Sequence, residues 1–361
     1  MEKSRNKKKN YRGYLIMTGL LIATTTMAVI FFFGFYIRRF TQKSDTNQYD
    51  NYYIMIAGDT NSSLWRSVYE GAYEAGLSKN SYVDLLNDFF ENGYSREDLM
   101  RIAIASEVDG IIVGADESDE MTELINEAAG QGIPVVTLYG DNTRSERCTF
   151  VGIGSYDLGR EYGREVLEIA QMKHFSTQAQ DDETQVEAEK RPVRVMVLVN
   201  AYAQDSGQNI LCSGIQETIE NEKQEGMEIE LSLVSIDGTN TFSVEESIRD
   251  IFMEEDLPDI IVCLNELNTV CVYQAVVDYN KVGQVNILGY YDSDTIIKAI
   301  DRNVIDATIS IDTAQMGKYC VDALTEYNTY GNTSQYFIAD IELINKENVS
   351  LYLDGGDTED E

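Results

Sequence analysis

Residues 108–138 read VDGIIVGADESDEMTELINEAAGQGIPVVTL and hold two short apolar runs, 110–113 and 133–138. The runs begin 23 residues apart, a spacing that suits a strand, a helix and the next strand. Run 110–113 (GIIV) lacks the polar alternation of a half-exposed strand, so it is typical of a parallel sheet that is buried on both faces. The stretch therefore predicts two parallel strands connected by a helix.

The same unit recurs along the chain in two series. Between the apolar runs, residues fall at helical spacing, as at Leu64, Val68 and Ala72. The expected strands are 52–57, 82–86, 110–113, 133–138 and 149–153, then 193–199, 229–236, 259–264, 285–289 and 307–311. About 300 residues exceed one hydrophobic core, so we expect an α/β protein of two lobes, each a doubly wound parallel sheet. Such sheets bind ligands beyond the carboxyl ends of their strands, so two facing lobes would form a ligand cleft.

The N-terminal region predicts a membrane anchor. Residues 1–13 form a basic tip, and residues 14–37 carry no charged side chain. Twenty-four helical residues span about 36 Å, enough to cross a bilayer with some tilt. Because Lys and Arg stay on the cytoplasmic side, we expect a single-pass signal anchor in the cell membrane with all later residues outside the cytoplasm. The alternative is a long, cleaved signal peptide. Residues 38–51 are polar and read as a linker.

Composition excludes several classes of function. Residues 1–43 hold 9 of the 28 Lys and Arg residues and 1 of the 62 Asp and Glu residues, which leaves a formal charge near −42 on 44–361. Such a surface repels nucleic acid. The five cysteines are widely spaced without CxxC pairs, and His174 is the only histidine. We therefore expect buried free thiols, no metal site, no cofactor and no Ser–His–Asp triad.

Four segments carry a resemblance to a known family. They are 54–65 with 70–72, 108–113 with 132–138, 150–154 with Gly159, and 286–292 with 307–310. Together they resemble the periplasmic solute-binding proteins of the ribose/galactose-binding type, whose type I fold is shared with the ligand domains of lac-repressor-type regulators. The resemblance implies two lobes joined by three crossovers and a hinge that closes around a small solute.

The resemblance also implies the domain boundaries. Lobe 1 would comprise 52–154 plus 312–340, and lobe 2 would comprise 155–311 plus 341–353. Residues 176–191 are polar without an apolar face and read as a flexible insertion. Residues 354–361 form an acidic tail.

Ligand-binding positions follow from the resemblance residue by residue. The first ligand loop places Asn61, Ser62 and Trp65 at the cleft. The other implied positions are Tyr139, Asp141, Asn209, Asn265, Tyr291, Asp292 and Asp312. Several charged residues that grip sugars in ribose-type proteins are replaced here: Tyr139 stands where the Asp-Arg pair begins, and Asn209 stands where an arginine is usual. A Tyr-lined cleft would suit a sugar, a glycoside, an aromatic metabolite or a nucleoside. A degenerate pocket that binds little is a further alternative.

Trp65, the sole tryptophan, has two interpretations. A flat aromatic at this loop can cover the apolar C–H face of a sugar ring or an aromatic ligand. The alternative is ordinary core packing.

The leading functional hypothesis is a membrane-tethered solute-binding protein that delivers its ligand to an ABC permease. The alternative is a ligand-sensing receptor that acts with a membrane histidine kinase or chemoreceptor, and the missing lipid-anchor cysteine favours it slightly. An enzyme that uses Asp59, Asp141, Asp292 and Asp312 as paired acids is a third possibility. We expect no catalysis, because the resembled family is overwhelmingly non-catalytic.

Overall fold

The computed structural model describes residues 49–58, 62–90, 94–184, 191–201, 207–238, 240–254 and 256–353, together with Met27; for 174–184 only the backbone is described. The chain forms two units, 1–50 and 51–361, and the second contains the strands and helices described below. The expected anchor 14–37, apart from Met27, and the tail 354–361 lie outside the described residues. Within those described ranges, no helix has the length and apolar character needed to cross a bilayer.

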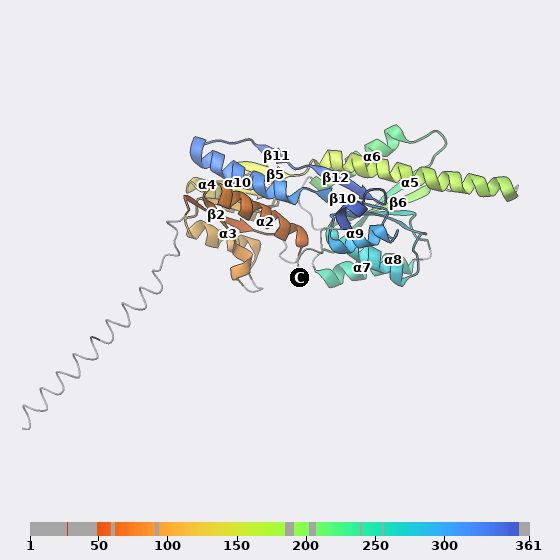
Figure 1. Ribbon diagram of the computed structural model, residues 1–361, viewed down its shortest axis with the longest axis horizontal. Coiled ribbons are helices and arrows are strands. Elements are labelled where there is room, and N and C mark those ends of the chain that lie inside the picture. Colours follow the sequence, from red (N-terminus) through yellow and green to blue (C-terminus); the bar gives the residue numbers. More distant parts are fainter. Residues whose placement is uncertain are drawn as a thin grey trace, which may run out of the picture. The chain divides into compact units, whose positions relative to one another are not determined.

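The second unit contains two six-stranded sheets (Figure 1). Sheet 1 has the order β11-β5-β4-β3-β1-β2, and sheet 2 has the order β12-β10-β9-β8-β6-β7. The strands of sheet 1 are β1 (Asn51–Ile56), β2 (Ser81–Leu85), β3 (Gly110–Val113), β4 (Val135–Leu138), β5 (Thr149–Gly152) and β11 (Tyr336–Ile338). Those of sheet 2 are β6 (Val193–Asn200), β7 (Ile229–Ile236), β8 (Ile260–Cys263), β9 (Asn286–Tyr290), β10 (Ala307–Ile311) and β12 (Ile341–Asn345). All ten strands expected from the sequence are therefore present.

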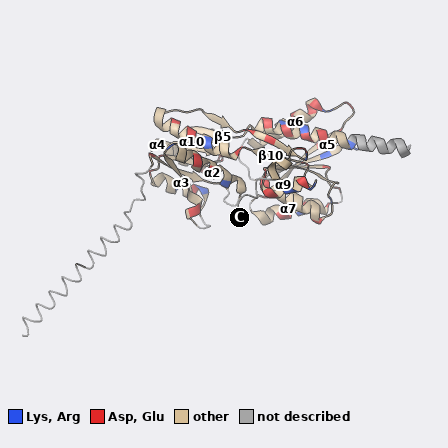
Figure 2. Cartoon of the chain, in the orientation of Figure 1, with Lys and Arg blue, Asp and Glu red and all other residues tan. Residues whose placement is uncertain are grey.

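Helices cover both faces of each sheet. The helices are α2 (Ser63–Ser78), η1 (Leu86–Phe89), α3 (Arg96–Ala105), α4 (Asp119–Gly130), α5 (Ser155–Thr184), α6 (Gly207–Glu222), α7 (Thr241–Met253), α8 (Glu266–Asp278), α9 (Asp294–Asp301), α10 (Thr313–Tyr330) and α11 (Ser350–Leu353). We call sheet 1 with α2, α3, α4 and α10 lobe 1, and sheet 2 with α5 to α9 and α11 lobe 2. Acidic residues are distributed over helices of both lobes (Figure 2).

The alternation of side chains along each strand builds these layers. On β1, Tyr53 and Met55 belong to the core cluster that includes residues of α2 and α10, whereas Ile54 and Ile56 belong to the cluster with α3 and α4. Because successive side chains point to opposite faces, a strand that is buried on both sides is apolar throughout. This explains the continuous apolar runs of the sequence.

One edge strand departs from the expected parallel arrangement. The pairs among β1 to β11 are parallel, but β12 is antiparallel to β10. Only Ala339 and Asp340 separate β11 from β12, so the chain passes from the carboxyl end of sheet 1 directly to the carboxyl end of sheet 2. Entering there, β12 must run against β10, and Asp312 N donates to Asp340 O at the crossing (3.1 Å).

Helix α5 is longer than the sequence pattern suggested. We expected a flexible insertion at 176–191, but the backbone remains helical to Thr184. Gln, Ala and Glu in this segment have high intrinsic helix propensity, which sustains a helix without an apolar face. Residues 185–190 lie outside the described part of the chain.

Candidate functional site

A cavity of about 670 Å³ lies between the two sheets, at the carboxyl ends of their strands. Its lining residues end or follow strands β4 to β9, or lie in the first turns of the helices after them, and three come from the segment after β1 where α2 begins. They are Ser62, Leu64, Trp65, Tyr139, Ile153, Ser155, Leu158, Asn200, Gly207, Gln208, Leu211, Ile236, Gly238, Thr241, Val244, Leu264, Asn265, Glu266, Leu267, Asn268, Val270 and Tyr290. Both lobes contribute, and the volume falls within the range of about 300–1,000 Å³ that is usual for small-molecule pockets.

Trp65 forms an aromatic wall on the lobe 1 side. Its indole lies so close to Gly58 and Gly114 that a Cβ built on either glycine would come within 2.9 Å and 2.6 Å of the ring. The Tyr139 ring lies 5.7 Å from the indole, centroid to centroid, and is tilted by 42°. Trp65 is half-buried, packs against the core and lines the cavity, so core packing is observed and contact with a ligand stays a prediction. The glycines are needed because only they allow the ring to seat on the backbone.

Two tyrosines occupy matching positions with unusual backbone angles. Tyr139 follows β4 and Tyr291 follows β9, and these strands hold the same place in the order of their sheets. Both residues are left-handed, with φ of 68° and 73°. Each donates its backbone N–H to a neighbouring strand, Tyr139 to Val151 O (3.0 Å) and Tyr291 to Ile309 O (2.8 Å). The left-handed region is costly for a bulky residue, so the surrounding structure must hold both turns in place.

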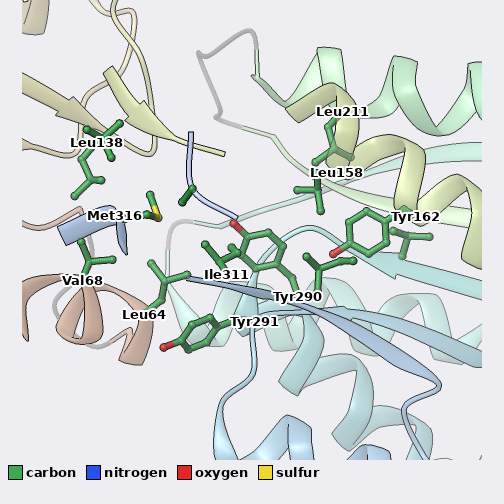
Figure 3. Packing of buried hydrophobic residues seen from close by; sticks show 14 of the residues in the cluster. Leu64, Val68, Leu138, Leu158, Tyr162, Leu211, Tyr290, Tyr291, Ile311 and Met316 are labelled. Atoms are coloured by element: carbon green, nitrogen blue, oxygen red, sulfur yellow. The ribbon is translucent and has the colours of Figure 1, made fainter. Parts of the chain in front are cut away.

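Tyrosine hydroxyls join the lobes. The Tyr139 and Tyr290 hydroxyls are 2.9 Å apart, one from each lobe. Burial raises the pKa of both phenols. Burial likewise raises the pKa of Tyr291 to about 12, and the nearby hydroxyls of Ser67 and Ser63 on α2 offset part of that rise. Figure 3 shows Tyr290 and Tyr291 on the side of the core where lobe 2 meets Leu64 of α2.

A carboxylate makes a second contact between the lobes. Glu266, the first residue of α8, accepts hydrogen bonds from Ser63 Oγ (2.7 Å) and Ser62 Oγ (3.3 Å) at the start of α2. Of the lining residues given above, Glu266 is the one that carries a charge, and none is Lys or Arg. The cavity can therefore accommodate a neutral or cationic solute, whereas an anion would meet an uncompensated negative charge.

Amide side chains line the lobe 2 side. Asn200 ends β6, and its backbone N–H donates to the side-chain oxygen Oε1 of Gln208 (2.8 Å). Asn265 is the N-cap of α8, and its Oδ1 accepts from Asn268 N (2.8 Å). Amides offer both donors and acceptors to a ligand hydroxyl. An aromatic wall that faces amides is an arrangement that can hold a polyhydroxylated ring.

Four of the implied ligand residues line the cavity: Ser62, Trp65, Tyr139 and Asn265. Asn61 lies outside the described residues. The other five lie away from the lining, each for a local reason. Asp141 is held by Arg147, with Nη2 at 2.7 Å from its Oδ2. Asp292 accepts from Ser310 Oγ (2.7 Å), and Asp312 caps α10 by accepting from Gln315 N (2.8 Å).

The remaining two differ from the cavity residues by one position. Asn209 is exposed on α6, whereas Gln208 and Leu211 line the cavity. Adjacent helical residues point about 100° apart, so a shift of one position turns a side chain away. Tyr291 is buried against α2, and its neighbour Tyr290 lines the cavity. Tyr291 follows β9 in a left-handed conformation, so its side chain leaves the direction set by the strand.

Sequence reasoning missed Asn200, Gln208, Glu266, Asn268 and Tyr290. Glu266 follows Asn265 directly, and Asn200 ends an expected strand. A polar residue at the carboxyl end of an expected strand was therefore a pattern that could have indicated both as cavity residues. Nothing in the sequence marked Tyr290 over Tyr291 or Gln208 over Asn209, because each choice depends on side-chain direction.

Throughout the ranges given above, no group of three or more His, Cys, Asp and Glu is placed to hold a metal ion. All five cysteines are free thiols, and Cys263, Cys271 and Cys320 are buried. Of the four aspartates considered as paired acids, Asp59 is outside the described residues and the other three have the partners named above.

Comparison with known proteins agrees with this architecture. Residues 53–332, more than half of the chain, match the family described as periplasmic binding protein domain. The chain belongs to this periplasmic binding protein family, and its fold is the type I fold of sugar-binding members. No curated protein matches the sequence significantly.

Solved structures share the fold at low identity. The XylFII–LytSN complex matches with a TM-score of 0.66 at 22% identity, covering 82% of this chain and 98% of that chain. GanP, a glucose-galactose binding protein from Geobacillus stearothermophilus, matches with a TM-score of 0.63 at 20% identity, covering 82% and 98%. A sugar ABC transporter sugar-binding protein from Bacillus halodurans matches with a TM-score of 0.66 at 20% identity, covering 84% and 100%. At these identities the likeness establishes the fold alone.

Proposed function

We propose that this protein is a membrane-tethered, extracytoplasmic solute-binding protein that captures a neutral sugar or sugar-like molecule between its lobes and delivers it to an ABC transporter. The observation that carries the proposal is the cavity with Trp65 and Tyr139 on one wall and Asn265 on the other. The ring face of Trp65 can cover the C–H face of a pyranose, and the amides can bind its hydroxyls. Membrane tethering rests on the basic tip and the uncharged segment 14–37.

Closure around the ligand follows from the two-lobed site. A solute that contacts Trp65 on lobe 1 and Asn265 on lobe 2 binds the closed state better than the open one, and this difference shifts the population. Solved structures of the same fold include a glucose-galactose binding protein, an arabinose binding protein and a solute-binding protein with bound D-allose, which supports sugars as the first class to test.

The experiment is a calorimetric titration of the full chain, purified in detergent, with D-xylose, D-glucose, D-galactose, D-allose and L-arabinose. Adenosine and the aryl glycoside salicin serve as comparison compounds. We expect at least one neutral sugar to bind and to change the fluorescence of Trp65, the sole tryptophan. Binding of adenosine but of none of the sugars would replace the sugar by a nucleoside, and binding of none of the seven compounds would contradict the proposal.

A sensory role is the second candidate. XylFII, which shares the fold, is solved in a complex with LytSN, so a protein of this architecture can assemble with another chain. In this role the ligand-bound form would engage a membrane histidine kinase or a chemoreceptor rather than a permease. Crosslinking of the full chain in its native membrane, with and without the bound sugar, distinguishes the two: a permease subunit in the crosslinked product supports transport, and a kinase or chemoreceptor supports sensing.

A further inference from the structure

The side-chain amide nitrogen of Asn268 is buried without a hydrogen-bond partner among the described residues. The residue is 2% exposed, and no described residue accepts from its amide nitrogen. It lies in the first turn of α8, where its own backbone N–H is already used by Asn265 Oδ1. Thr269, next in the helix, donates its hydroxyl to Asn265 O (2.8 Å) and accepts from Tyr290 N (3.0 Å). The polar groups of Asn265 and Thr269 are therefore already hydrogen-bonded to other residues.

Such a group is expensive in a folded protein. Buried polar atoms are almost always hydrogen-bonded, and an unpaired one carries the full desolvation penalty. An apolar side chain at this position would avoid that penalty. The presence of an amide at this position therefore points to a hydrogen-bond partner other than the described residues of the chain.

Asn268 is also one of the residues that line the cavity between the lobes. Leu267 and Val270, on either side of it in the sequence, line the same cavity and are apolar, as are Ile236 and Val244 at the facing ends of β7 and α7. An unpaired amide among apolar lining residues can take its partner from the contents of the cavity.

We propose that the Asn268 amide binds one hydroxyl of the solute, so that it forms a polar subsite at the lobe 2 end of the cavity that selects neutral polyhydroxylated ligands. The inference rests on the proposed function. A hydroxyl fits because it both donates and accepts, and the amide can present either its oxygen or its nitrogen after a rotation of about 180°. An anionic group is disfavoured, because no Lys or Arg stands among the lining residues and Glu266 does.

The test compares two buried asparagines. Asn268→Leu keeps the approximate size of the side chain and removes the amide. The matched control is Asn142→Leu in lobe 1, because Asn142 is fully buried but its amide nitrogen donates to Asp116 O (2.7 Å) and Thr122 Oγ1 (2.9 Å). Both variants and the wild type are titrated as full chains in detergent with the five sugars named above, and their unfolding midpoints are measured without ligand.

For the sugar that the wild type binds most tightly, we expect Asn268→Leu to weaken binding about tenfold, which corresponds to about 1.4 kcal/mol. Its ligand-free unfolding midpoint should be unchanged or higher, whereas Asn142→Leu should lower the midpoint and leave the affinity unchanged. A weakening of less than about threefold, or a fall in midpoint as large as that of Asn142→Leu, would overturn the inference while leaving the proposed function intact. If the wild type binds none of the sugars, the proposed function fails and the inference fails with it.

A second measurement identifies the hydroxyl. Monodeoxy analogues of the bound sugar are titrated into the wild type and Asn268→Leu as a thermodynamic cycle. One analogue should lose affinity for the wild type but bind Asn268→Leu as well as the parent sugar does. Equal losses in both proteins for every analogue would overturn the assignment of Asn268.

Discussion

The hydroxyl of Tyr139 in lobe 1 lies 2.9 Å from the hydroxyl of Tyr290 in lobe 2. Burial raises the pKa of both groups, so they stay protonated through neutral pH and the hydrogen bond persists there. The backbone of Tyr139 is in the left-handed region, so the hydrogen bond links a constrained turn after β4 to the end of the buried strand β9. The pair is one of the contacts between the lobes, beside the hydrogen bonds from Ser62 and Ser63 to Glu266.

Tyr139→Phe should open the two lobes. The variant leaves the Tyr290 hydroxyl unpaired and removes about 0.5–1.5 kcal/mol from the contact. Small-angle scattering should show a larger radius of gyration without ligand. The control is Tyr53→Phe, because the Tyr53 hydroxyl contacts Thr325 Oγ1 (3.4 Å) within lobe 1. Identical radii for the wild type and Tyr139→Phe would contradict the role given to this pair.

Gly114→Ala should displace Trp65 from its seat. A Cβ on Gly114 would lie 2.6 Å from the indole, so the ring must move toward the cavity. We expect solute binding to weaken by about 1–3 kcal/mol, with a shifted tryptophan emission maximum. Gly130→Ala is the control, since a Cβ there meets nothing within 4 Å. Unaltered emission and affinity in Gly114→Ala would show that the seat does not position the ring.

Glu266 should make the cavity reject anions. We expect D-glucuronate to bind at least about tenfold more weakly than D-glucose or whichever neutral sugar binds, because a carboxylate near Glu266 gains no compensating cation. Glu266→Gln should reduce this discrimination in calorimetric titrations. It also weakens the hydrogen bonds from Ser62 and Ser63, so affinity for neutral sugars serves as the internal reference. Discrimination of the same size in Glu266→Gln would rule out this carboxylate as its source.

Asn265 should contribute to both stability and binding. As the N-cap of α8 it satisfies the Asn268 N–H, so Asn265→Ala should cost about 0.5–2 kcal/mol of unfolding free energy in addition to affinity. Asn265→Ser retains a capping oxygen but loses the amide. We therefore expect near-wild-type urea denaturation and weakened solute binding for Asn265→Ser. Equal destabilisation by both substitutions would show that capping is not the stabilising interaction.

Glu165 on α5 should make stability fall as pH rises. Burial, and then the charges of Glu168, Glu161 and Asp306, raise its pKa from 4.5 to about 7. Between these values the folded protein holds a proton that the unfolded chain has released, so the free energy of unfolding decreases with increasing pH across this window.

Glu165→Gln removes that dependence. The variant should be more stable than the wild type at pH 8, and the difference should disappear towards pH 4.5, as measured by urea denaturation across the range. The control Glu225→Gln changes an exposed residue in the turn before β7 and should parallel the wild type. A constant difference between Glu165→Gln and the wild type at every pH would contradict the assigned titration.

The sequence by itself determined the layered α/β architecture. The continuous apolar runs at 110–113 and 260–263 require burial on both faces, and helical spacing in segments such as α2 supplies the covering layers. The local pattern is sufficient to predict these strands, because a strand that is buried on both faces stays apolar even if its predicted ends are shifted by a residue or two. The family resemblance also placed Trp65 and Asn265 at the cavity, where the helices after β1 and β8 begin.

Only the tertiary structure decided which of two adjacent residues faces the cavity. Tyr290 rather than Tyr291, and Gln208 rather than Asn209, line it. The left-handed backbone at Tyr291 turns its side chain out of the strand direction, and adjacent residues on a helix point about 100° apart. The antiparallel direction of β12 likewise follows from where the chain enters sheet 2. The partners of Asp141 and the unpaired amide of Asn268 depend on residues brought together by folding, and no linear pattern records them.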